Sequence, residues 1–396
     1  MAKKSAAGSG TIRKKTVTRK GKKYQFWEAR FTVGTDPGTG KQVQRSISGK
    51  TQKEVAQKLK AVTAAIDAGT YQAPSNMTVG QWLDTWTAEY LGGVKPRTVD
   101  SYTATAKLWL KPAFGAVKLE GLTSHAIQKF YNGLLKEDGD RKALSPKTIK
   151  NINGVFHRAL QQAVANGLIR FNPADNVILP RVEKAELHPL DEQQIASFME
   201  AIKGHPLENL FLVTLFTGMR EGEVLGLTWD CVDFAAGTIT VNKQLFRERD
   251  GSGIYHLAET KTGKTRTITP APYVMKVLKQ VSAQQKERKL TAGGVWDNPL
   301  NLVFTNETGR YLTHLHVYRK FKQVVASIGC PECRFHDLRH SYAMASLRAG
   351  DDIKTVQENL GHSTIAMTMD IYAFVTDRMK QDSAARMERF IQSISS

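Results

Sequence analysis

A short stretch near the C-terminal end of the chain combines residue types that could bind either a metal ion or a phosphate. The pattern C-x2-C-x2-H-x3-H, typical of zinc ligands, is formed by Cys330, Cys333, His336 and His340. His336 and Arg339 are also three residues apart at the expected start of a helix, so their side chains would share one helical face. Zinc sites of this type usually separate the two ligand pairs by about 12 or more residues, whereas only two residues separate Cys333 from His336. The spacing therefore disfavours a zinc site, and the two cysteines are expected to be small apolar residues in the loop before the helix.

A second candidate group lies in the sequence LFTGMREGEVLGLTW, residues 215–229. Gly218 is expected to end one helix and Arg220 to begin the next, with Glu223 one turn further along. The helix dipole disfavours a cation at a helix start but suits a bound anion, and the arginine fork offers two aligned donors for phosphate oxygens. A structural salt bridge from Arg220 to Glu223 is the alternative interpretation.

Residues 255–270, YHLAETKTGKTRTITP, predict a β-hairpin with a lysine-rich turn. A lysine at the tip of such a hairpin, Lys261 or Lys264, can reach a leaving oxygen and give it a proton, although most lysines in turns are simply solvated. His362 is expected in a turn between helices, and Tyr372 lies ten residues further on. Taken singly, these two residues would be an ordinary capping histidine and a half-buried tyrosine.

In the order in which they follow along the chain, the arginine, lysine, His-x-x-Arg, histidine and tyrosine motifs resemble the active site of the tyrosine recombinase (phage integrase) family. The resemblance covers about residues 185–380 and is carried by TGMREGEVLGL, KT, HDLRH, LGH and the terminal Tyr372. It implies a site-specific DNA recombinase, the integrase or excision enzyme of a mobile element such as a phage or a conjugative transposon. Such an enzyme cuts and rejoins two duplexes through a covalent 3′-phosphotyrosine and a Holliday junction.

The resemblance also implies a role for each matching residue. Tyr372 attacks a DNA phosphate, and Arg220 and Arg339 hold its non-bridging oxygens. Lys261 protonates the departing 5′ oxygen, with Lys264 as the alternative. His336 and His362 donate to the phosphate or assist proton transfer, and Glu223 orients Arg220.

Elementary chemistry agrees with these roles. A free tyrosine has a pKa of about 10, and nearby cations lower the cost of removing its proton during the attack. Fixed guanidinium donors stabilise the negative charge that develops on the phosphate oxygens. The covalent phosphotyrosine conserves the energy of the broken bond, so no ATP is expected. Two arginines, a lysine and two histidines supply the positive charge, and we therefore expect no metal ion and no other cofactor.

The chain as a whole fits a protein that binds a polyanion. It has 396 residues, enough for two or three domains, and a formal net charge of +19. Residues 1–70 contain 16 Lys and Arg against 4 Asp and Glu, which concentrates positive charge near the N-terminus. No apolar run reaches the roughly 18–20 residues of a membrane span, no signal peptide is recognisable, and the three cysteines form no disulfide framework. We therefore expect a DNA-binding protein of the bacterial cytoplasm, associated with the nucleoid.

Residues 1–70 are expected to form an α+β unit that resembles the arm-type DNA-binding domains of phage and transposon integrases. Alternation predicts two strands joined by a turn at Lys20–Lys22 and a third strand at QVQRSIS. A helix then begins at a T-x-x-E capping box, Thr51 and Glu54, and ends at Gly69. The aromatic residues of the first strands are expected to be mainly core, namely Tyr24, Phe26 and Trp27.

Two larger domains are expected to follow. Residues 71–180 predict a bundle of four amphipathic helices, similar to the core-site DNA-binding domains of the same integrases; its first helix has an apolar stripe at Val79, Trp82, Leu83 and Trp86. Residues 181–396 predict the catalytic domain, with helices, then strands at about 238–269, then helices and a C-terminal tail helix. The fold class is therefore multidomain α+β, with a three-stranded sheet plus helix, a helical bundle, and a mainly α catalytic domain that holds a small β-sheet.

DNA contacts outside the catalytic site are predicted from the basic residues of the first two domains. Basic side chains that simply face solvent are the alternative. The candidates are Lys14, Lys15, Lys20, Lys22, Lys23, Arg30, Arg45, Lys95, Arg97 and Lys107.

The resemblance implies a homotetramer on double-stranded DNA, with attachment sites and arm sites as substrates. The sequence SAARMERFIQSISS, residues 383–396, predicts an amphipathic helix that docks on a neighbouring subunit, or alternatively folds back onto its own domain through Phe390 and Ile391. An excisionase or a host DNA-bending protein is a further expected partner, and a membrane is not.

Two other protein classes share parts of this pattern. A type IB topoisomerase uses the same chemistry but relaxes DNA without partner strands, and the basic N-terminal domain and short catalytic domain argue against it. A non-catalytic DNA-binding regulator would keep the basic residues and could lose Tyr372 or an arginine, whereas every catalytic position is filled here.

Overall fold

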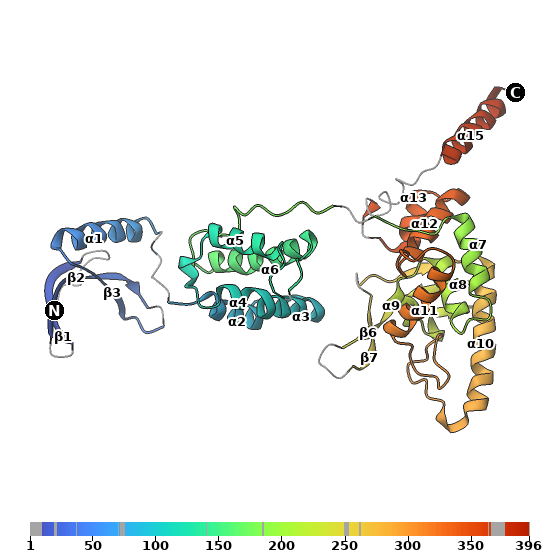
Figure 1. Cartoon of the computed structure of the whole chain (residues 1–396), viewed down its shortest axis with the longest axis horizontal. Coiled ribbons are helices and arrows are strands. Elements are labelled where there is room, and N and C mark those ends of the chain that lie inside the picture. The colour runs from blue at the N-terminus through green and yellow to red at the C-terminus, as the bar shows by residue number, and fades with distance from the viewer. Residues whose placement is uncertain are drawn as a thin grey trace. The chain divides into compact units, whose positions relative to one another are not determined.

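The computed structural model describes residues 10–19, 22–36, 38–69, 71, 76–139, 141–183, 186–248, 253–260, 263–362, 364–365 and 377–395. The contacts along the chain define two compact units, Met1–Glu183 and Lys184–Ser396. The first unit contains a sheet with one helix and then a set of helices, and the second contains helices with two small sheets (Figure 1). The division into three domains at residues 70 and 180 stays a prediction.

The N-terminal sheet is antiparallel and has the predicted strands. Each strand pairs with the next, in the order β1 (Thr11–Arg19), β2 (Lys22–Thr35) and β3 (Gln42–Gly49). The helix α1 (Gln52–Asp67) begins after Thr51, whose side chain accepts a hydrogen bond of 3.2 Å from the backbone N–H of Glu54, as the capping motif predicts. Gly69 follows the end of the helix with φ +68°, a conformation that glycine adopts without strain.

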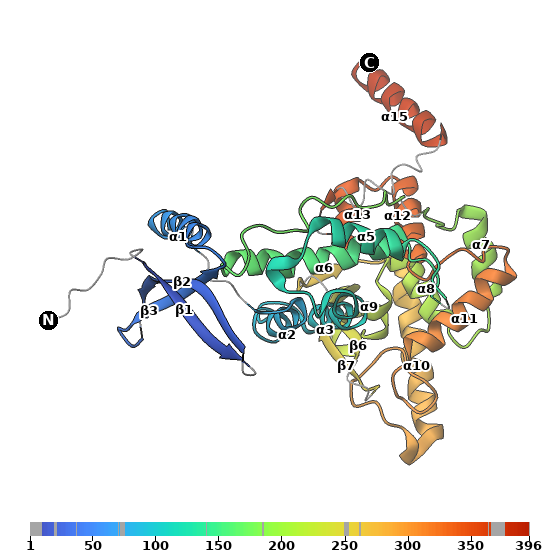
Figure 2. The ribbon, with the colours of Figure 1, turned by 60° about the vertical axis from the view of Figure 1, so that its left-hand side comes forward.

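The predicted aromatic core of this unit is wrong for Tyr24, which is 53% exposed, while Phe26 and Trp27 are half-buried. Tyr24 lies opposite Val17 near the end of the β1–β2 ribbon, which extends beyond the part of the sheet that α1 covers (Figure 2). The buried apolar residues lie instead where helix and sheet meet, at Ala29, Phe31 and Val55.

The following part of the first unit is helical and buries the predicted stripe. Its α-helices are α2 (Val79–Glu89), α3 (Pro96–Thr105), α4 (Lys111–Phe114), α5 (Ser124–Leu134) and α6 (Pro146–Ala165). Val79, Trp82, Leu83 and Trp86 are all buried. The indole N–H of Trp82 donates to the carbonyl of Ala159 at 2.8 Å and so joins α2 to α6.

One predicted helix of this set is not a continuous α-helix. A π-helical segment, Ala106–Leu110, separates α3 from α4. The backbone N–H of Lys111 bonds to the carbonyl of Ala106, five residues back. Pro112 comes next and has no N–H to donate, so the regular α-helical ladder is interrupted at this point.

The second unit is mainly helical. Its α-helices are α7 (Glu192–Ala201), α8 (Glu208–Thr217), α9 (Glu221–Leu225), α10 (Pro272–Ala292), α11 (His314–Ser327), α12 (Asp337–Ala349), α13 (Ile353–Leu360) and α15 (Asp377–Ser395). α8 is apolar on most of its surface and packs against both α10 and α12, as expected for a central buried helix (Figure 1). No helix in the described ranges is both long enough and apolar enough to cross a membrane.

The strands of this unit form two small sheets. One has the order β4 (Val232–Asp233), β5 (Thr238–Val241), β8 (Arg266–Ile268), and the other pairs β6 (Lys243–Arg247) with β7 (Tyr255–Glu259). The predicted hairpin between β7 and β8 is therefore wrong, because these consecutive strands do not pair with each other.

The strand pairing is offset between Glu259 and Arg266. Lys243 pairs with Glu259, and Val241 pairs with Arg266. The partners are two residues apart on one strand but seven apart on the other. The chain from Glu259 to Arg266 is therefore five residues longer than its partner, so a connecting loop separates β7 from β8, and Arg266 is the first residue after it that pairs again.

Candidate active site

Gly218 joins two helices at the first predicted motif. It ends α8 in the left-handed conformation, with φ +62°, and a Cβ at this position would lie 2.6 Å from Cδ1 of Tyr342. Glycine is therefore required both by the backbone and by the close packing. Arg220 follows as the residue that caps the start of α9, so the predicted positions of both residues are confirmed.

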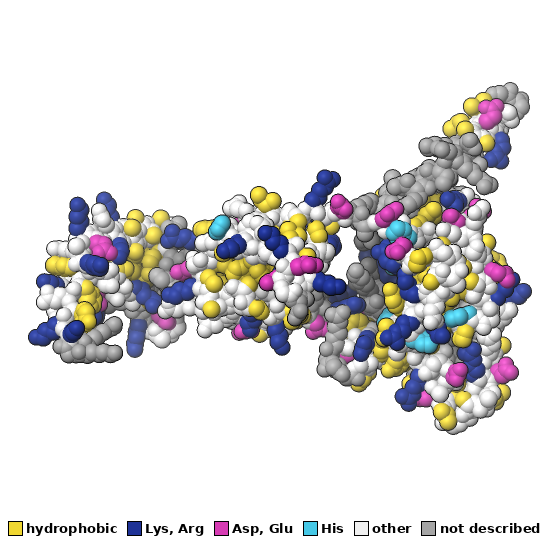
Figure 3. Space-filling model, in the orientation of Figure 1, with side chains coloured by type: hydrophobic (Ala, Val, Ile, Leu, Met, Phe, Trp, Pro, Cys, Tyr) yellow, Lys and Arg dark blue, Asp and Glu magenta, His cyan; other side chains and the backbone are white. Residues whose placement is uncertain are grey.

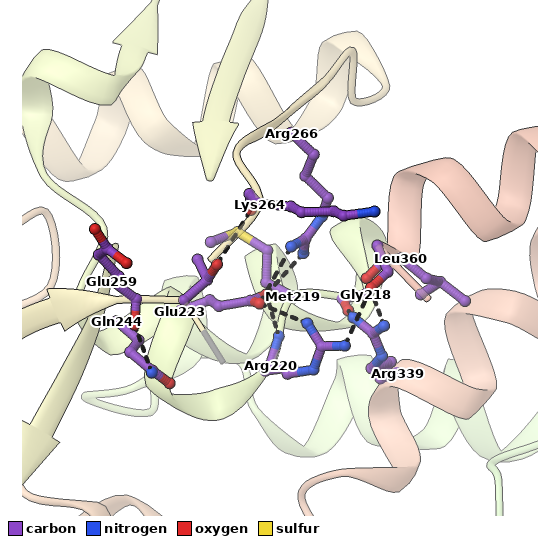
Figure 4. Close-up of polar contacts among 12 residues, drawn as sticks. Gly218, Met219, Arg220, Glu223, Gln244, Glu259, Lys264, Arg266, Arg339 and Leu360 are labelled. Atoms are coloured by element: carbon purple, nitrogen blue, oxygen red, sulfur yellow. Dashed lines mark hydrogen bonds and ion pairs between the residues drawn. The ribbon is translucent and has the colours of Figure 1, made fainter. Parts of the chain in front are cut away.

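Glu223, on α9, is almost fully buried and contacts two arginines. Its carboxylate accepts from Arg220 Nη1 at 2.7 Å and from the backbone N–H of Arg220 at 3.0 Å. Arg266 donates to the same carboxylate through Nη1 at 3.1 Å and Nη2 at 2.7 Å (Figure 4). Burial alone would raise the pKa of Glu223, but the hydrogen bonds and charges of these two arginines lower it to about 2. The predicted salt bridge from Arg220 to Glu223 is thus present, while 20% of the Arg220 side chain stays exposed.

Arg339, on α12, is the most deeply buried cation of the group, with 1% of its surface exposed. Nη1 donates to the carbonyl of Gly218 at 2.7 Å and Nη2 donates to the carbonyl of Leu360. Its Nε is buried without a hydrogen-bond partner among the residues that the structure describes. Burial, and next the charge of Arg220, lower the pKa of Arg339 to about 9. A buried guanidinium in this state would be stabilised by an incoming anion.

Three arginines from three elements meet at the C-terminal end of α13. They donate to successive backbone carbonyls: Arg266 Nε to Asn359 at 2.8 Å, Arg339 Nη2 to Leu360, and Arg220 Nη2 to Gly361 at 3.3 Å. The last carbonyls of a helix have no partners within the helix and carry partial negative charge, so they suit cationic donors. The end of α13 therefore gathers the guanidinium groups that the sequence places far apart.

The predicted histidines lie close to these arginines. His336 is the residue before α12, and His362 follows Gly361, which ends α13 with φ +64°. Burial lowers the pKa of His336 to about 4, with further contributions from His340 and from the arginine charges. Burial and the charges of Arg339 and Arg220 lower the pKa of His362 to about 3. Both imidazoles are therefore neutral near pH 7 in the absence of DNA.

The zinc interpretation finds no support in the geometry. Cys330 and Cys333 form a tight turn, closed by a hydrogen bond of 3.1 Å from the Cys333 N–H to the Cys330 carbonyl. The rings of His336 and His340 contact each other edge to face, 5.2 Å apart. Burial raises the pKa of Cys333 to about 12, which disfavours the thiolate that zinc would need. Within the described ranges, the His, Cys, Asp and Glu side chains form no group of three or more that could hold a metal ion.

Two predicted catalytic residues, Lys261 and Tyr372, lie outside the described residues. Lys264 is described and is exposed, two residues before Arg266. Its carbonyl accepts from the hydroxyl of the buried Thr260 at 3.1 Å, which closes the base of the loop.

The predicted DNA-contact residues of the sheet divide between its two faces. Successive strand residues point to opposite faces of the sheet. Lys15, Lys22 and Arg30 therefore lie on the face away from α1, which we call the open face. Lys14, Lys23 and Arg45 point to the other side, and Lys20 lies outside the described part. Figure 3 shows Lys and Arg side chains spread over this unit.

The sequence prediction missed one member of the open face, Arg13. Glu28 lies at the centre of that face and accepts from Arg13 at 2.9 Å and from Lys15 at 2.9 Å, with Arg30 at 3.7 Å. The alternation of β1 was the available signal, because it places Arg13 and Lys15 on the same side.

In the helical part, Lys95, Arg97 and Lys107 are exposed, as a DNA-contact role requires. Lys107 belongs to the π-helical segment. Lys111, by contrast, forms an ion pair of 2.5 Å with Asp84.

Comparison with known proteins gives matches along most of the chain. A family model described as the phage integrase family matches residues 188–379, and one described as the phage integrase N-terminal SAM-like domain matches residues 78–135. A tyrosine recombinase XerC-like protein of Caldanaerobacter subterraneus is 30% identical over 388 residues, which span 94% of this chain and 97% of that protein. An integrase of Streptomyces ambofaciens is 27% identical, over 94% of each chain.

Solved structures show the same fold. The integrase of transposon Tn1549 in complex with transposon right end DNA is 25% identical, with a TM-score of 0.66, over 79% of this chain and 100% of that chain. A lambda integrase tetramer bound to a Holliday junction is 19% identical, with a TM-score of 0.54, over 87% of this chain and 91% of that chain.

Proposed function

Since this chain belongs to the phage integrase family, we propose that its arginine and histidine cluster holds the phosphate at which DNA is cut. The protein is a tyrosine-type site-specific recombinase, an integrase or excision enzyme that acts on double-stranded DNA. The observation that carries the assignment of roles is the convergence of Arg220 and Arg339 at the end of α13, beside His336 and His362. Because its substrate is DNA, we place its action at the nucleoid of a bacterial cell.

The phosphate clamp has one rigid and one adaptable arginine. Arg339 is buried and is held by two carbonyls, and its Nε, which has no hydrogen-bond partner among the described residues, marks a fixed point for a non-bridging oxygen. Arg220 is held by Glu223 on one side and is partly exposed on the other, where it can donate to the second oxygen. Neutral His336 and His362 can each donate one ring N–H to the same phosphate. The developing charge thus meets donors that need little rearrangement.

Tyr372 and Lys261 complete the reaction in this proposal, on the strength of their motif positions. The Tyr372 hydroxyl attacks the phosphorus, its proton leaves, and a 3′-phosphotyrosine forms as the bond to the 5′ oxygen breaks. Lys261 gives a proton to that oxygen, and Lys264 stays the alternative donor. Thr260, buried and bonded to the Lys264 carbonyl, holds the base of the loop that carries both lysines. Attack by a 5′ hydroxyl from the partner duplex reverses the step and joins the strands.

The C-terminal helix fits an exchange of tails between subunits. On α15, exposed apolar residues recur with the spacing of one helical face, at Met387, Phe390, Ile391 and Ile394. An exposed apolar stripe of this kind needs a partner surface. We assign that surface to the neighbouring subunit of a tetramer. Deleting residues 383–396 should abolish strand exchange while leaving DNA binding by single subunits, and unchanged recombination by the truncated chain would exclude this role.

The open face of the N-terminal sheet fits a separate DNA site. Arg13, Lys15 and Arg30 surround one carboxylate, Glu28, so the face keeps a net positive charge. Binding to arm-type DNA should weaken steeply with salt, because cations on a protein displace counterions from phosphates. Replacing both Arg13 and Lys15 by Ala should reduce the slope of log K against log salt by about 2.

The assignment of the nucleophile is tested with nicked duplexes of random sequence and protein treated with EDTA. Wild-type protein should form a covalent DNA adduct that survives a denaturing gel, and Tyr372→Phe should form none. Tyr342→Phe is the matched control, since Tyr342 is a half-buried tyrosine of the same unit whose hydroxyl accepts a hydrogen bond of 3.2 Å from Asn359. An adduct that persists in Tyr372→Phe would refute the role of Tyr372, and an adduct lost to EDTA would refute the metal-free mechanism. Sequencing the trapped DNA gives the recombination site.

A further inference from the structure

Arg266 occupies a position that the reaction itself does not explain. It is only 12% exposed, and three of its N–H groups are already in use: Nη1 and Nη2 bond to Glu223, and Nε bonds to the Asn359 carbonyl. A guanidinium bound in this bidentate way is fixed in its plane as well as in its position. Arg266 is therefore poorly placed to bind a phosphate and well placed to hold its neighbours.

The first neighbour that Arg266 holds is the carboxylate that orients Arg220. Arg266 takes one oxygen of Glu223 with each Nη atom, while Arg220 Nη1 shares Oε1 (Figure 4). With Arg266 in place, both oxygens are fixed and Arg220 meets a carboxylate of defined orientation. Without Arg266, the carboxylate could rotate and form a two-pronged pair with Arg220, which would withdraw donors from the phosphate.

The second neighbour is the turn that leads to His362. Gly361 lies against the side chain of Arg266, and a Cβ at Gly361 would be 2.9 Å from Arg266 Cδ. The aliphatic part of the Arg266 side chain thus packs against this turn, and its Nε donates to the carbonyl of Asn359, two residues before Gly361.

The third neighbour is the loop that carries the candidate general acid. Arg266 is the first residue after β7 that pairs with a strand again, opposite Val241. Its ion pair with Glu223 attaches this end of the loop to α9, and its bond to Asn359 attaches it to α13.

From these contacts we propose that Arg266 is a positioning residue of the recombination reaction. It sets the orientation of Arg220 through Glu223 and supports the turn that leads from α13 to His362. This inference rests on the proposed function.

The test compares two substrates in single-turnover formation of the covalent adduct, using the full chain and the site recovered from the trapping experiment. One substrate has an ordinary phosphodiester, and the other has a methylphosphonate at the cut position, which removes the negative charge that the arginine clamp stabilises. Arg266→Lys should slow the phosphodiester reaction about 10- to 100-fold, since small misplacements of reacting groups have effects of this size. On the methylphosphonate, the loss should shrink to less than about threefold. DNA affinity should be unchanged.

Two further variants make the result unambiguous. Arg310→Lys is the matched control, because Arg310 is exposed and forms an ordinary surface ion pair with Asp297 at 3.0 Å; it should react like wild type. Glu223→Asp alters the same link without removing a charge and should reproduce the substrate-dependent loss even if Arg266→Lys folds poorly.

The possible outcomes separate this inference from the proposed function. Equal losses on both substrates would show a merely structural role and overturn the inference, as would a wild-type rate for Arg266→Lys. If wild-type protein formed no adduct dependent on Tyr372, the proposed function itself would fail.

Discussion

Replacing Glu223 by Gln should destabilise the catalytic unit by about 3 kcal/mol. The pKa of this carboxyl falls from an ordinary 4.5 to about 2. Each tenfold change in the ionisation constant corresponds to about 1.4 kcal/mol of free energy. Removing one partner of a buried ion pair typically costs about 3–5 kcal/mol, and the amide keeps some of the hydrogen bonds, so both arguments lead to about the same value. Glu223→Gln leaves Arg220 and Arg266 without their shared counter-charge, beside the buried Arg339.

Hydrogen exchange of peptides from α8 and α12 measures this loss in the full chain, because both helices pack directly around the site and belong to the catalytic unit. Glu200→Gln is the matched control, since Glu200 is 72% exposed and its ion pair with Lys203 should contribute less than about 1 kcal/mol. A loss below about 1 kcal/mol for Glu223→Gln, or one equal to that of the control, would refute the reasoning.

The dependence on pH provides a second check with a defined sign. A carboxyl whose pKa is lowered by folding stabilises the folded state above its unfolded pKa of about 4.5, and this contribution disappears as the pH falls toward about 2. The difference between wild type and Glu223→Gln should therefore stay constant from about pH 8 to 5 and narrow below about pH 4.5. A difference that changed between about pH 6 and 8 would contradict the assignment of the stabilisation to Glu223.

The same geometry predicts the behaviour of other positions. Arg339→Lys should slow adduct formation about 10²–10³-fold in single-turnover assays, because an ammonium group cannot reproduce the fork that reaches two carbonyls and a phosphate together. Gly361→Ala should lower the unfolding free energy more than Gly204→Ala; both have positive φ, but only at Gly361 does the added Cβ meet another side chain, and equal losses would contradict this. Urea stability should fall as the pH drops from about 6.5 toward 4, since the unfolded imidazoles bind protons that His336 and His362, with pKa values of about 4 and 3, do not; an unchanged slope in the variant with both histidines replaced by Gln would exclude them as the cause.

The local features of the site could be predicted from the sequence because they depend on short-range rules. Gly218 ends a helix, Arg220 begins the next, and Glu223 follows within hydrogen-bonding reach, each as its spacing indicates. The helical stripe of α2 was predictable for the same reason. The convergence of distant segments could not be predicted from spacing. Arg266 and Glu223 are 43 residues apart, and they meet because α9 packs against β6 and β8 packs against α13.

Arg266 nevertheless left a signal in the sequence. In TRTIT, alternation places it on the same side as Ile268, which is buried, so an inward-facing arginine needed a buried partner. The predicted hairpin failed for a different reason. Its turn residues are those of a hairpin, but β7 pairs with β6 and β8 pairs with β5. These pairings override the local preference of β7 and β8 to pair with each other.

The row of carbonyls at the end of α13 makes the site unequally tolerant of mutation. On the donor side, each contact depends on one arginine and is lost by a single substitution. On the acceptor side, the atoms belong to the peptide backbone, which every side chain at Asn359 or Leu360 leaves in place. Variation at Leu360 is therefore limited by packing, and variation at Asn359 by packing and by the loss of its side-chain hydrogen bond to Tyr342. In a library of variants, both positions should accept replacements that keep α13 in place. A change in the path of the backbone at Gly361 would displace the acceptor row as a unit, and no arginine could restore it.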